Sequence, residues 1–212
     1  MLQIANDEFA PDATDLRQHY AALKELGDCY AALGEFDRAR QCYQESAALE
    51  PGLPGPYLGL GVVAMQEARL DQAEQAFTAA LEKDPQCAEA YGGLAMIRQQ
   101  HADYAAAFEM YLRCLERDTD NLVALLGLFQ TSCQMGTFAM VIHFLEVYLD
   151  RHPGDTSVLF CLATLYAREG RLVQAQDALL DVLTLEPDKA EATNLLAQVQ
   201  HRLRQAQPLE TV

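Results

Sequence analysis

Histidine is the side chain best suited to proton transfer near neutral pH, so the histidines are the first candidates for catalysis. The five of them lie at irregular intervals, at His19, His101, His143, His152 and His201. His143 shares a helical face with Glu146, and His152 follows Asp150, but neither pair has a third partner. The metalloprotease, hydrolase and phosphate-loop patterns HExxH, GxSxG and GxxxxGK[ST] do not occur. We therefore expect a protein that is not an enzyme and that uses no cofactor.

The stretch Asp118-Thr119-Asp120-Asn121 begins like a calcium-binding loop. An EF-hand loop also needs a central glycine and a closing glutamate, and both are missing here. We expect this stretch to be a turn that caps a helix beginning near Leu122, and we expect no metal site.

The cysteines occur in no CxxC pair and show no metal-ligand spacing. They lie at Cys29, Cys42, Cys87, Cys114, Cys133 and Cys161. Free thiols in this number are typical of a reducing compartment. The first residues, MLQIANDEFAPDATD, lack the basic and apolar regions of a secretory signal, and no apolar run approaches the ~20 residues of a membrane helix. These features favour a cytoplasmic protein that does not insert directly into membranes.

Fifteen basic against thirty-one acidic residues give a net charge of −16. Such a surface repels phosphate backbones and anionic lipid headgroups. Nucleic acid is therefore excluded as an expected partner, and another protein with a basic, apolar or amphipathic segment is favoured.

Prolines mark a fixed interval along the chain. Pro51 and Pro85 are 34 residues apart, as are Pro153 and Pro187, and Thr119 occupies the one missing position between them. Proline cannot continue a helix, so each one marks the end of a helical unit. A 34-residue period is the length of one helix-turn-helix repeat.

Other residue types recur with the same period. Each presumed turn begins with a small residue, at Gly34, Ala68, Ala102, Gly136 and Gly170. Each second helix carries a large apolar residue, at Tyr43, Phe77, Tyr111, Leu145 and Leu179. Each first helix carries a leucine followed by a mostly small residue, with the leucines at Leu26, Leu60, Leu94, Leu128 and Leu162. Phe129, Val141 and Thr119 depart from the pattern, so we expect the fourth repeat to be the least regular.

At these positions the chain resembles the tetratricopeptide repeat (TPR) family. The resemblance implies an all-α fold, a right-handed α-solenoid (superhelix) of antiparallel helix-turn-helix units. Five repeats span 20–187, and by period they are 20–53, 54–87, 88–121, 122–155 and 156–189. We expect residues 188–206 to form a capping helix, residues 1–19 to be a partly disordered N-terminal segment without a matching cap, and residues 207–212 to be a disordered tail.

We expect the helices at about 20–33 and 37–50, 55–67 and 71–84, 88–101 and 105–118, 122–135 and 139–152, and 156–169 and 173–186. The final helix should run to about Ala206, and Asp12 to His19 could extend the first helix backwards.

The resemblance also places the first helix of each repeat on a concave wall that binds peptides. The residues it assigns to this groove are Leu58, Gly59, Val62, Met65, Gln66, Gly92, Gly93, Met96, Gln99, Gln100, Leu126, Gly127, Gln130, Cys133, Gln134 and Phe160. In the second to fourth repeats the only charged residue that it assigns to the wall is Glu89. Apolar and amide side chains predict an apolar or amphipathic ligand.

Two binding modes of TPR proteins fit poorly. A carboxylate clamp needs lysine, asparagine and arginine, but Lys24 is followed by Asp28 where the asparagine belongs, and the next two repeats offer no cation. An asparagine ladder would need asparagine where Gly59, Gly93 and Gly127 stand. These glycines either let a ligand backbone come close or are tolerated on a wall held by packing.

We therefore expect a non-catalytic scaffold or adaptor for protein–protein interaction. Two alternatives stay open: a chaperone for an export or assembly substrate, and a self-assembling homo-oligomeric TPR scaffold. The groove could also be filled by the protein's own N-terminal segment or by a neighbouring copy.

Overall fold

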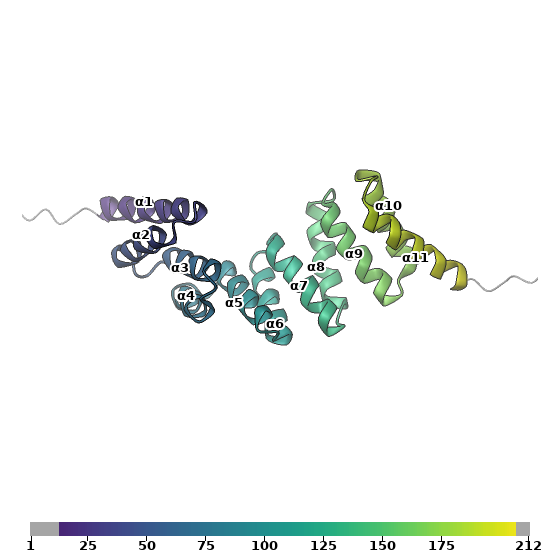
Figure 1. The fold of residues 1–212 in the computed structure, drawn as a ribbon, viewed down its shortest axis with the longest axis horizontal. Helices are drawn as coiled ribbons and strands as arrows, with labels where there is room; N and C mark the ends of the chain where they lie inside the picture. Colours follow the sequence, from purple (N-terminus) through teal and green to yellow (C-terminus); the bar gives the residue numbers. More distant parts are fainter. Residues whose placement is uncertain (1–12, 207–212) are drawn as a thin grey trace, which may run out of the picture. The chain divides into compact units, whose positions relative to one another are not determined.

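The computed structural model describes residues 13–206, and every element within them is a helix (Figure 1). The eleven helices of this range are α1 (Ala13–Ala32), α2 (Phe36–Leu49), α3 (Gly55–Gln66), α4 (Leu70–Lys83), α5 (Ala88–Gln100), α6 (Tyr104–Leu115), α7 (Leu122–Met135), α8 (Ala139–Arg151), α9 (Thr156–Glu169), α10 (Leu172–Leu185) and α11 (Ala190–Ala206). The expected all-α fold is confirmed. None of these helices is long and apolar enough to cross a membrane.

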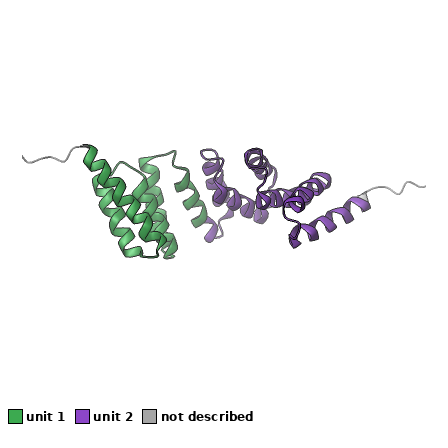
Figure 2. Ribbon diagram, turned by 90° about the horizontal axis from the view of Figure 1, so that it is seen from above, with its two compact units in different colours: residues 1–97 green, residues 98–212 purple. Residues whose placement is uncertain are grey.

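The chain divides into two compact units, residues 1–97 and residues 98–212 (Figure 2). The boundary falls within α5, so its first ten residues belong to unit 1 and its last three to unit 2.

The 34-residue register located the helices closely. Apart from the start of α11, which is Ala190 rather than the expected residue 188, and two further ends, every observed bound lies within one residue of the expected one. The first of these two is α1, which begins at Ala13 and so includes the stretch up to His19. The second is α6, which ends at Leu115, three residues early. The predictions for residues 1–12 and for the tail 207–212 lie outside the described residues.

The turn inside each repeat requires a left-handed backbone. Gly34, Gly136 and Gly170 have φ values of 75°, 74° and 80°, and Ala68 and Ala102 adopt 57° and 58° at the equivalent positions. Glycine takes this conformation without steric cost, whereas the Cβ of alanine is crowded there. The recurrent small residue is thus a requirement of the turn.

The core follows the register but is not uniform. The leucines predicted to be equivalent differ in burial: Leu128 and Leu162 are 0% and 6% exposed, whereas Leu94 is half-buried and Leu26 is 44% exposed. In the described residues no helix precedes α1, so the side of α1 that carries Leu26 is uncovered. Leu94 is thus less deeply buried than Leu128, although both occupy the same position of the repeat.

The helix α11 covers the end of the last repeat. Its apolar stripe is buried at Ala192 and Val199, while Gln198, His201 and Gln205 face solvent. Arg202 also donates a hydrogen bond to the carbonyl oxygen of Ala167 on α9, at 2.7 Å. An amphipathic helix of this kind hides the apolar face of a terminal repeat.

Replacing Leu128 by alanine should lower the free energy of unfolding by about 2–5 kcal/mol, because a fully buried side chain leaves a cavity. Leu26→Ala removes the same atoms from an exposed site and should cost less than about 1 kcal/mol. Urea denaturation of both variants checks this. Equal losses for the two would contradict the burial described above.

The left-handed turns predict different changes in stability for a glycine-to-alanine and an alanine-to-glycine substitution. Gly136→Ala should destabilise the protein by about 1–2 kcal/mol, because it places a Cβ in the left-handed region. Ala102→Gly relieves the same strain and should be neutral or stabilising by up to about 1 kcal/mol, after allowing for the greater freedom of the unfolded chain. Thermal unfolding should show a lower midpoint for Gly136→Ala and an unchanged or higher midpoint for Ala102→Gly, and a lowered midpoint for both would contradict the assignment.

Candidate functional site

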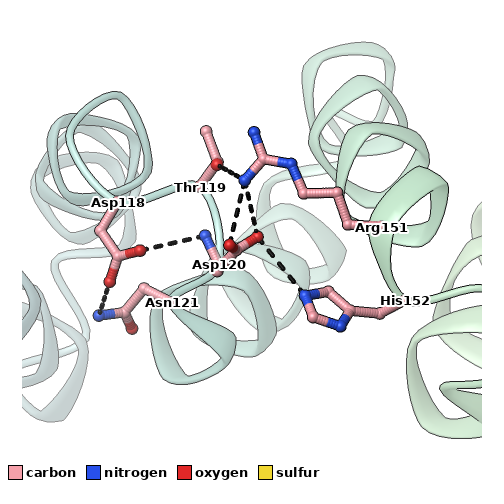
Figure 3. Close-up of polar contacts among 6 residues, drawn as sticks. All are labelled: Asp118, Thr119, Asp120, Asn121, Arg151 and His152. Carbon is pink, nitrogen blue, oxygen red and sulfur yellow. Dashed lines mark hydrogen bonds and ion pairs between the residues drawn. The ribbon is translucent and has the colours of Figure 1, made fainter.

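In the described part of the chain, no group of three or more His, Cys, Asp or Glu side chains is placed to hold a metal ion. The calcium-like stretch is a turn between α6 and α7 (Figure 3). Asp118 Oδ1 accepts from the backbone N–H of Asp120 at 3.1 Å, and Asn121 Oδ1 accepts from the backbone N–H of Ala124 at 3.0 Å. The expected helix cap is confirmed.

The carboxylate of Asp120 is paired with Arg151 of the next repeat and lies close to His152. Arg151 Nη1 lies 3.0 Å from both carboxylate oxygens and donates to Thr119 Oγ1 at 2.9 Å (Figure 3). His152 Nε2 lies 3.6 Å from Asp120 Oδ1. Thr119, which replaces the missing proline, therefore helps to tie this turn to the end of α8.

The predicted wall of unit 1 is partly core and partly exposed. Leu58 and Met65 are half-buried and pack against the cluster around Phe77 and Ile97. Val62 and Met96, at equivalent positions of α3 and α5, are 46% and 38% exposed. Gln66 is also exposed. We call Val62, Gln66 and Met96, with the half-buried Leu58 and Met65, the unit 1 face.

The glycines of the predicted wall do not offer open backbone to a ligand. A Cβ built on Gly59 would lie 2.4 Å from the Tyr43 ring, one on Gly93 would lie 2.5 Å from the Phe77 ring, and one on Gly127 would lie 2.2 Å from the Tyr111 ring. The space beside each glycine is therefore filled by an aromatic ring of the preceding repeat. Gly92 is buried as well. These contacts favour the alternative that the glycines serve the packing of the wall.

The same rings touch glycine on their other side. A Cβ on Gly27 would lie 2.6 Å from Tyr43, and one on Gly61 would lie 2.6 Å from Phe77. Tyr43 and Phe77 thus each sit between the first helices of two successive repeats. Sequence offered a signal for this arrangement, because Gly27 and Gly59 stand at equal distances, 16 residues, before and after Tyr43.

In unit 2 two predicted wall residues, Gln99 and Gln130, take part in internal hydrogen bonds. The Tyr111 hydroxyl donates to Gln99 Oε1 at 2.7 Å, and Gln99 Nε2 donates to Gln130 Oε1 at 2.9 Å. Burial raises the pKa of Tyr111 to about 12, so this phenol keeps its proton and acts as the donor. These two hydrogen bonds orient Gln99. Gln130 is exposed, and the hydrogens on its Nε2 take no part in them.

The remaining wall residues of unit 2 lie nearer the surface. Gln100 and Gln134 are exposed, whereas Leu126 and Cys133 are half-buried. Phe160 is half-buried, and Lys189 Nζ lies 5.8 Å from the centre of its ring. Val123, which the family resemblance also assigns to this wall, lies one helical turn before Leu126 on α7 and is 60% exposed. We call Val123, Leu126, Gln130 and Gln134 the unit 2 face.

The lysine that resembles part of a carboxylate clamp is already paired. Lys24 Nζ lies 2.7 Å from Asp28 Oδ2, and the Tyr43 hydroxyl donates to Asp28 Oδ1 at 2.8 Å. Asp28 therefore binds the cation that such a clamp would offer to a ligand carboxylate.

The contact between Gly127 and Tyr111 predicts that the stability of the protein falls when residue 127 carries a methyl group. Gly127→Ala places a Cβ against the buried Tyr111 ring and should destabilise the protein by about 1–3 kcal/mol, although alanine favours the helix by up to about 1 kcal/mol. Gly154→Ala is the control, because nothing lies within 4 Å of its added Cβ. Calorimetric unfolding should separate the two variants. A Gly127→Ala protein as stable as the parent would show that the ring does not need the glycine.

Two protein families match the chain. Residues 14–129 match the family described as the cilia and flagella-associated protein 70 middle TPR-like domain, and residues 148–207 match a tetratricopeptide repeat family. No curated protein sequence matches the chain.

Solved structures share the fold at low identity. PilF of Pseudomonas aeruginosa is similar with a TM-score of 0.70 and 18% identity, over 92% of this chain and 95% of that one. MamA is similar with a TM-score of 0.64 and 22% identity, over 82% of this chain and 95% of that one. YrrB, described as a TPR protein with an unusual peptide-binding site, has a TM-score of 0.64 and 16% identity, over 81% of this chain and 89% of that one. At such identities the likeness concerns the fold alone.

The helix-turn-helix repeats, their left-handed turns and their in-register small residues agree with these matches. The first family match alone covers more than half of the chain. The protein therefore belongs to the cilia and flagella-associated protein 70 middle TPR-like domain family, a family of tetratricopeptide repeats.

Proposed function

We propose that this protein is a non-catalytic binding module, a scaffold or adaptor that holds an apolar or amphipathic segment of another protein against the first helices of its repeats. The observation that carries the proposal is the exposure of apolar side chains on the first helices of several repeats. Val62 and Met96 on the unit 1 face and Val123 on the unit 2 face are 46%, 38% and 60% exposed. Apolar side chains left in water on a regular surface favour association with an apolar partner.

The polar groups of both faces are amides, with no charge among the residues that define them. Gln66 borders the unit 1 face, and Gln130 and Gln134 border the unit 2 face. An exposed amide donates to and accepts from a peptide backbone without the desolvation cost of a charge. This supports a peptide segment as the ligand of either face.

The methionine side chain at position 96 favours an adaptable interface. Methionine is unbranched and polarisable, so it fits partners of different shape. The net charge of −16 favours a segment flanked by basic residues, which would be steered toward the protein before it docks. YrrB, a structure of the same fold, carries a peptide-binding site according to its description, and this lends the proposal support by analogy.

We also propose a cytoplasmic location. All six cysteines are free thiols, and three of them are buried among apolar residues. A reducing compartment keeps such thiols from pairing with those of other chains.

The experiment uses two double variants with the same change of charge. Val62→Glu with Met96→Glu puts two carboxylates on the unit 1 face, and Val173→Glu with Met140→Glu puts two on exposed second-helix positions. Partners captured by the full chain are identified by mass spectrometry, and the strongest is purified and titrated by calorimetry. Because burying an unpaired charge costs several kcal/mol, the first variant should lose affinity about a hundredfold or more.

The control variant should bind like the parent. Both double variants should keep the parent's melting temperature, because all four substituted sites are exposed. If the first variant binds as tightly as the control, the partner uses another surface and the proposal is wrong.

A further inference from the structure

A pocket of about 300 Å³ lies in unit 1, lined by residues of α2, α3 and α4. Gln44 of α2, Leu60 and Ala64 of α3, and Gln75 and Ala76 of α4 are among its lining residues. Its volume is at the lower end of the range of about 300–1,000 Å³ that is typical of ligand pockets. None of the lining residues belongs to the unit 1 face, so the pocket is a separate surface.

The charged groups of the pocket are already paired. Glu67 lies in ion pairs with Arg40 and Arg69, and Arg40 also pairs with Asp37. A charged group that entered the pocket would have to replace one of these partners. Because the other lining groups are apolar side chains and amides, the pocket favours an uncharged ligand with a largely apolar body.

Three repeats later, the turn beside this pocket recurs. The residues Glu67, Arg69 and Gln72 correspond to Glu169, Arg171 and Gln174. In both turns the arginine donates to the glutamine, at 3.2 Å in the second repeat and at 2.6 Å in the fifth. In both, the backbone N–H of the arginine donates to the carbonyl oxygen five residues before it, at 2.8 Å and 2.9 Å. The two sites therefore share their local backbone and the placement of the arginine.

One position of the two sites differs: Ala64 in the second repeat corresponds to Tyr166 in the fifth. The Tyr166 ring is buried, Arg171 Cζ lies 4.3 Å from its centre, and its hydroxyl donates to Glu146 Oε1 of α8. The position equivalent to Glu146 is Gln44, which lines the pocket. The fifth repeat thus places a tyrosine ring of its own where the second repeat has an alanine and a pocket.

We propose that this pocket binds a tyrosine side chain of a partner protein, in the position that the Tyr166 ring takes in the fifth repeat. The partner's ring would lie on Ala64 and against the Arg69 guanidinium, which is attracted to an aromatic face. Its hydroxyl would donate to Gln44 Oε1, and the exposed amide of Gln75 would bind the adjoining peptide groups. The proposal does not depend on the proposed function, because the two surfaces share no residue.

The first test adds small probes to the isotope-labelled full chain and follows its backbone amide signals by NMR. N-acetyl-tyrosinamide should shift the signals of Ala64 and Gln44. N-acetyl-phenylalaninamide should bind about threefold to tenfold more weakly, because it lacks the hydroxyl and so one hydrogen bond.

A third probe separates a protein partner from a free phenol. p-Cresol carries the same ring without peptide groups and should bind about threefold or more weakly than N-acetyl-tyrosinamide, because it makes no contact with the Gln75 amide. If p-cresol binds as tightly or more tightly, the pocket takes free phenols and the assignment to a protein partner is overturned.

The second test fills the pocket from within. Ala64→Tyr should abolish the probe's shift at Gln44 and keep at least the parent's melting temperature, because the pocket accepts the added ring. Ala73→Tyr is the control, since it forces the same ring into a fully buried site of α4 and should lower the melting temperature by about 5 °C or more. A fall as large in Ala64→Tyr as in the control would overturn the proposal.

The third test removes the hydrogen bond without filling the pocket. Gln44→Ala should make the tyrosine and phenylalanine probes bind equally, whereas Gln41→Ala, also on α2 but outside the lining, should keep the difference between them. The proposal is wrong if N-acetyl-tyrosinamide shifts no signal around the pocket, or if its shifts persist in Ala64→Tyr.

Discussion

One contact sets the spacing of the early repeats: an aromatic ring of a second helix that fills the space left by glycines of two neighbouring first helices. Tyr43 lies against Gly27 and Gly59, and Phe77 lies against Gly61 and Gly93. No side chain larger than hydrogen fits at these glycines while the ring stays in place. Because one ring contacts both its own repeat and the next, it couples the packing of successive repeats.

This contact also decides which first-helix residues remain for a partner. Gly59 and Gly93 face inward to a ring, so the outward positions are those one turn away, Val62 and Met96. In unit 2 the ring of Tyr111 additionally orients Gln99 and, through it, Gln130. The proposed binding surface is thus a consequence of the packing beneath it.

The fourth repeat keeps the fold by different means. Phe129 stands where earlier repeats have glycine or alanine, and Leu145 stands where they have an aromatic ring. The turn that lacks proline is held instead by Arg151 and Asp120. Packing and polar contacts there replace the residues that the repeat pattern specifies.

The sequence allowed the helices to be predicted well, because proline and left-handed glycine act locally and recur at 34 residues. It could not reveal that Leu26 is exposed while Leu128 is buried, since both occupy one register position of the repeat. It also could not distinguish a glycine that faces a ligand from one that faces a ring. The sequence also could not show that Gln99 is hydrogen-bonded within the protein, because its partner Tyr111 lies on the following helix.

The central claim, that partners dock on the first helices, is tested most directly by methyl NMR of methionine-labelled protein with its purified partner. Met96 lies on the exposed first-helix side, and Met140 lies at a comparably exposed second-helix position. We predict that the partner shifts or broadens the Met96 methyl signal and leaves that of Met140 unchanged. A complex that perturbs Met140 while Met96 stays at its free position would contradict the account.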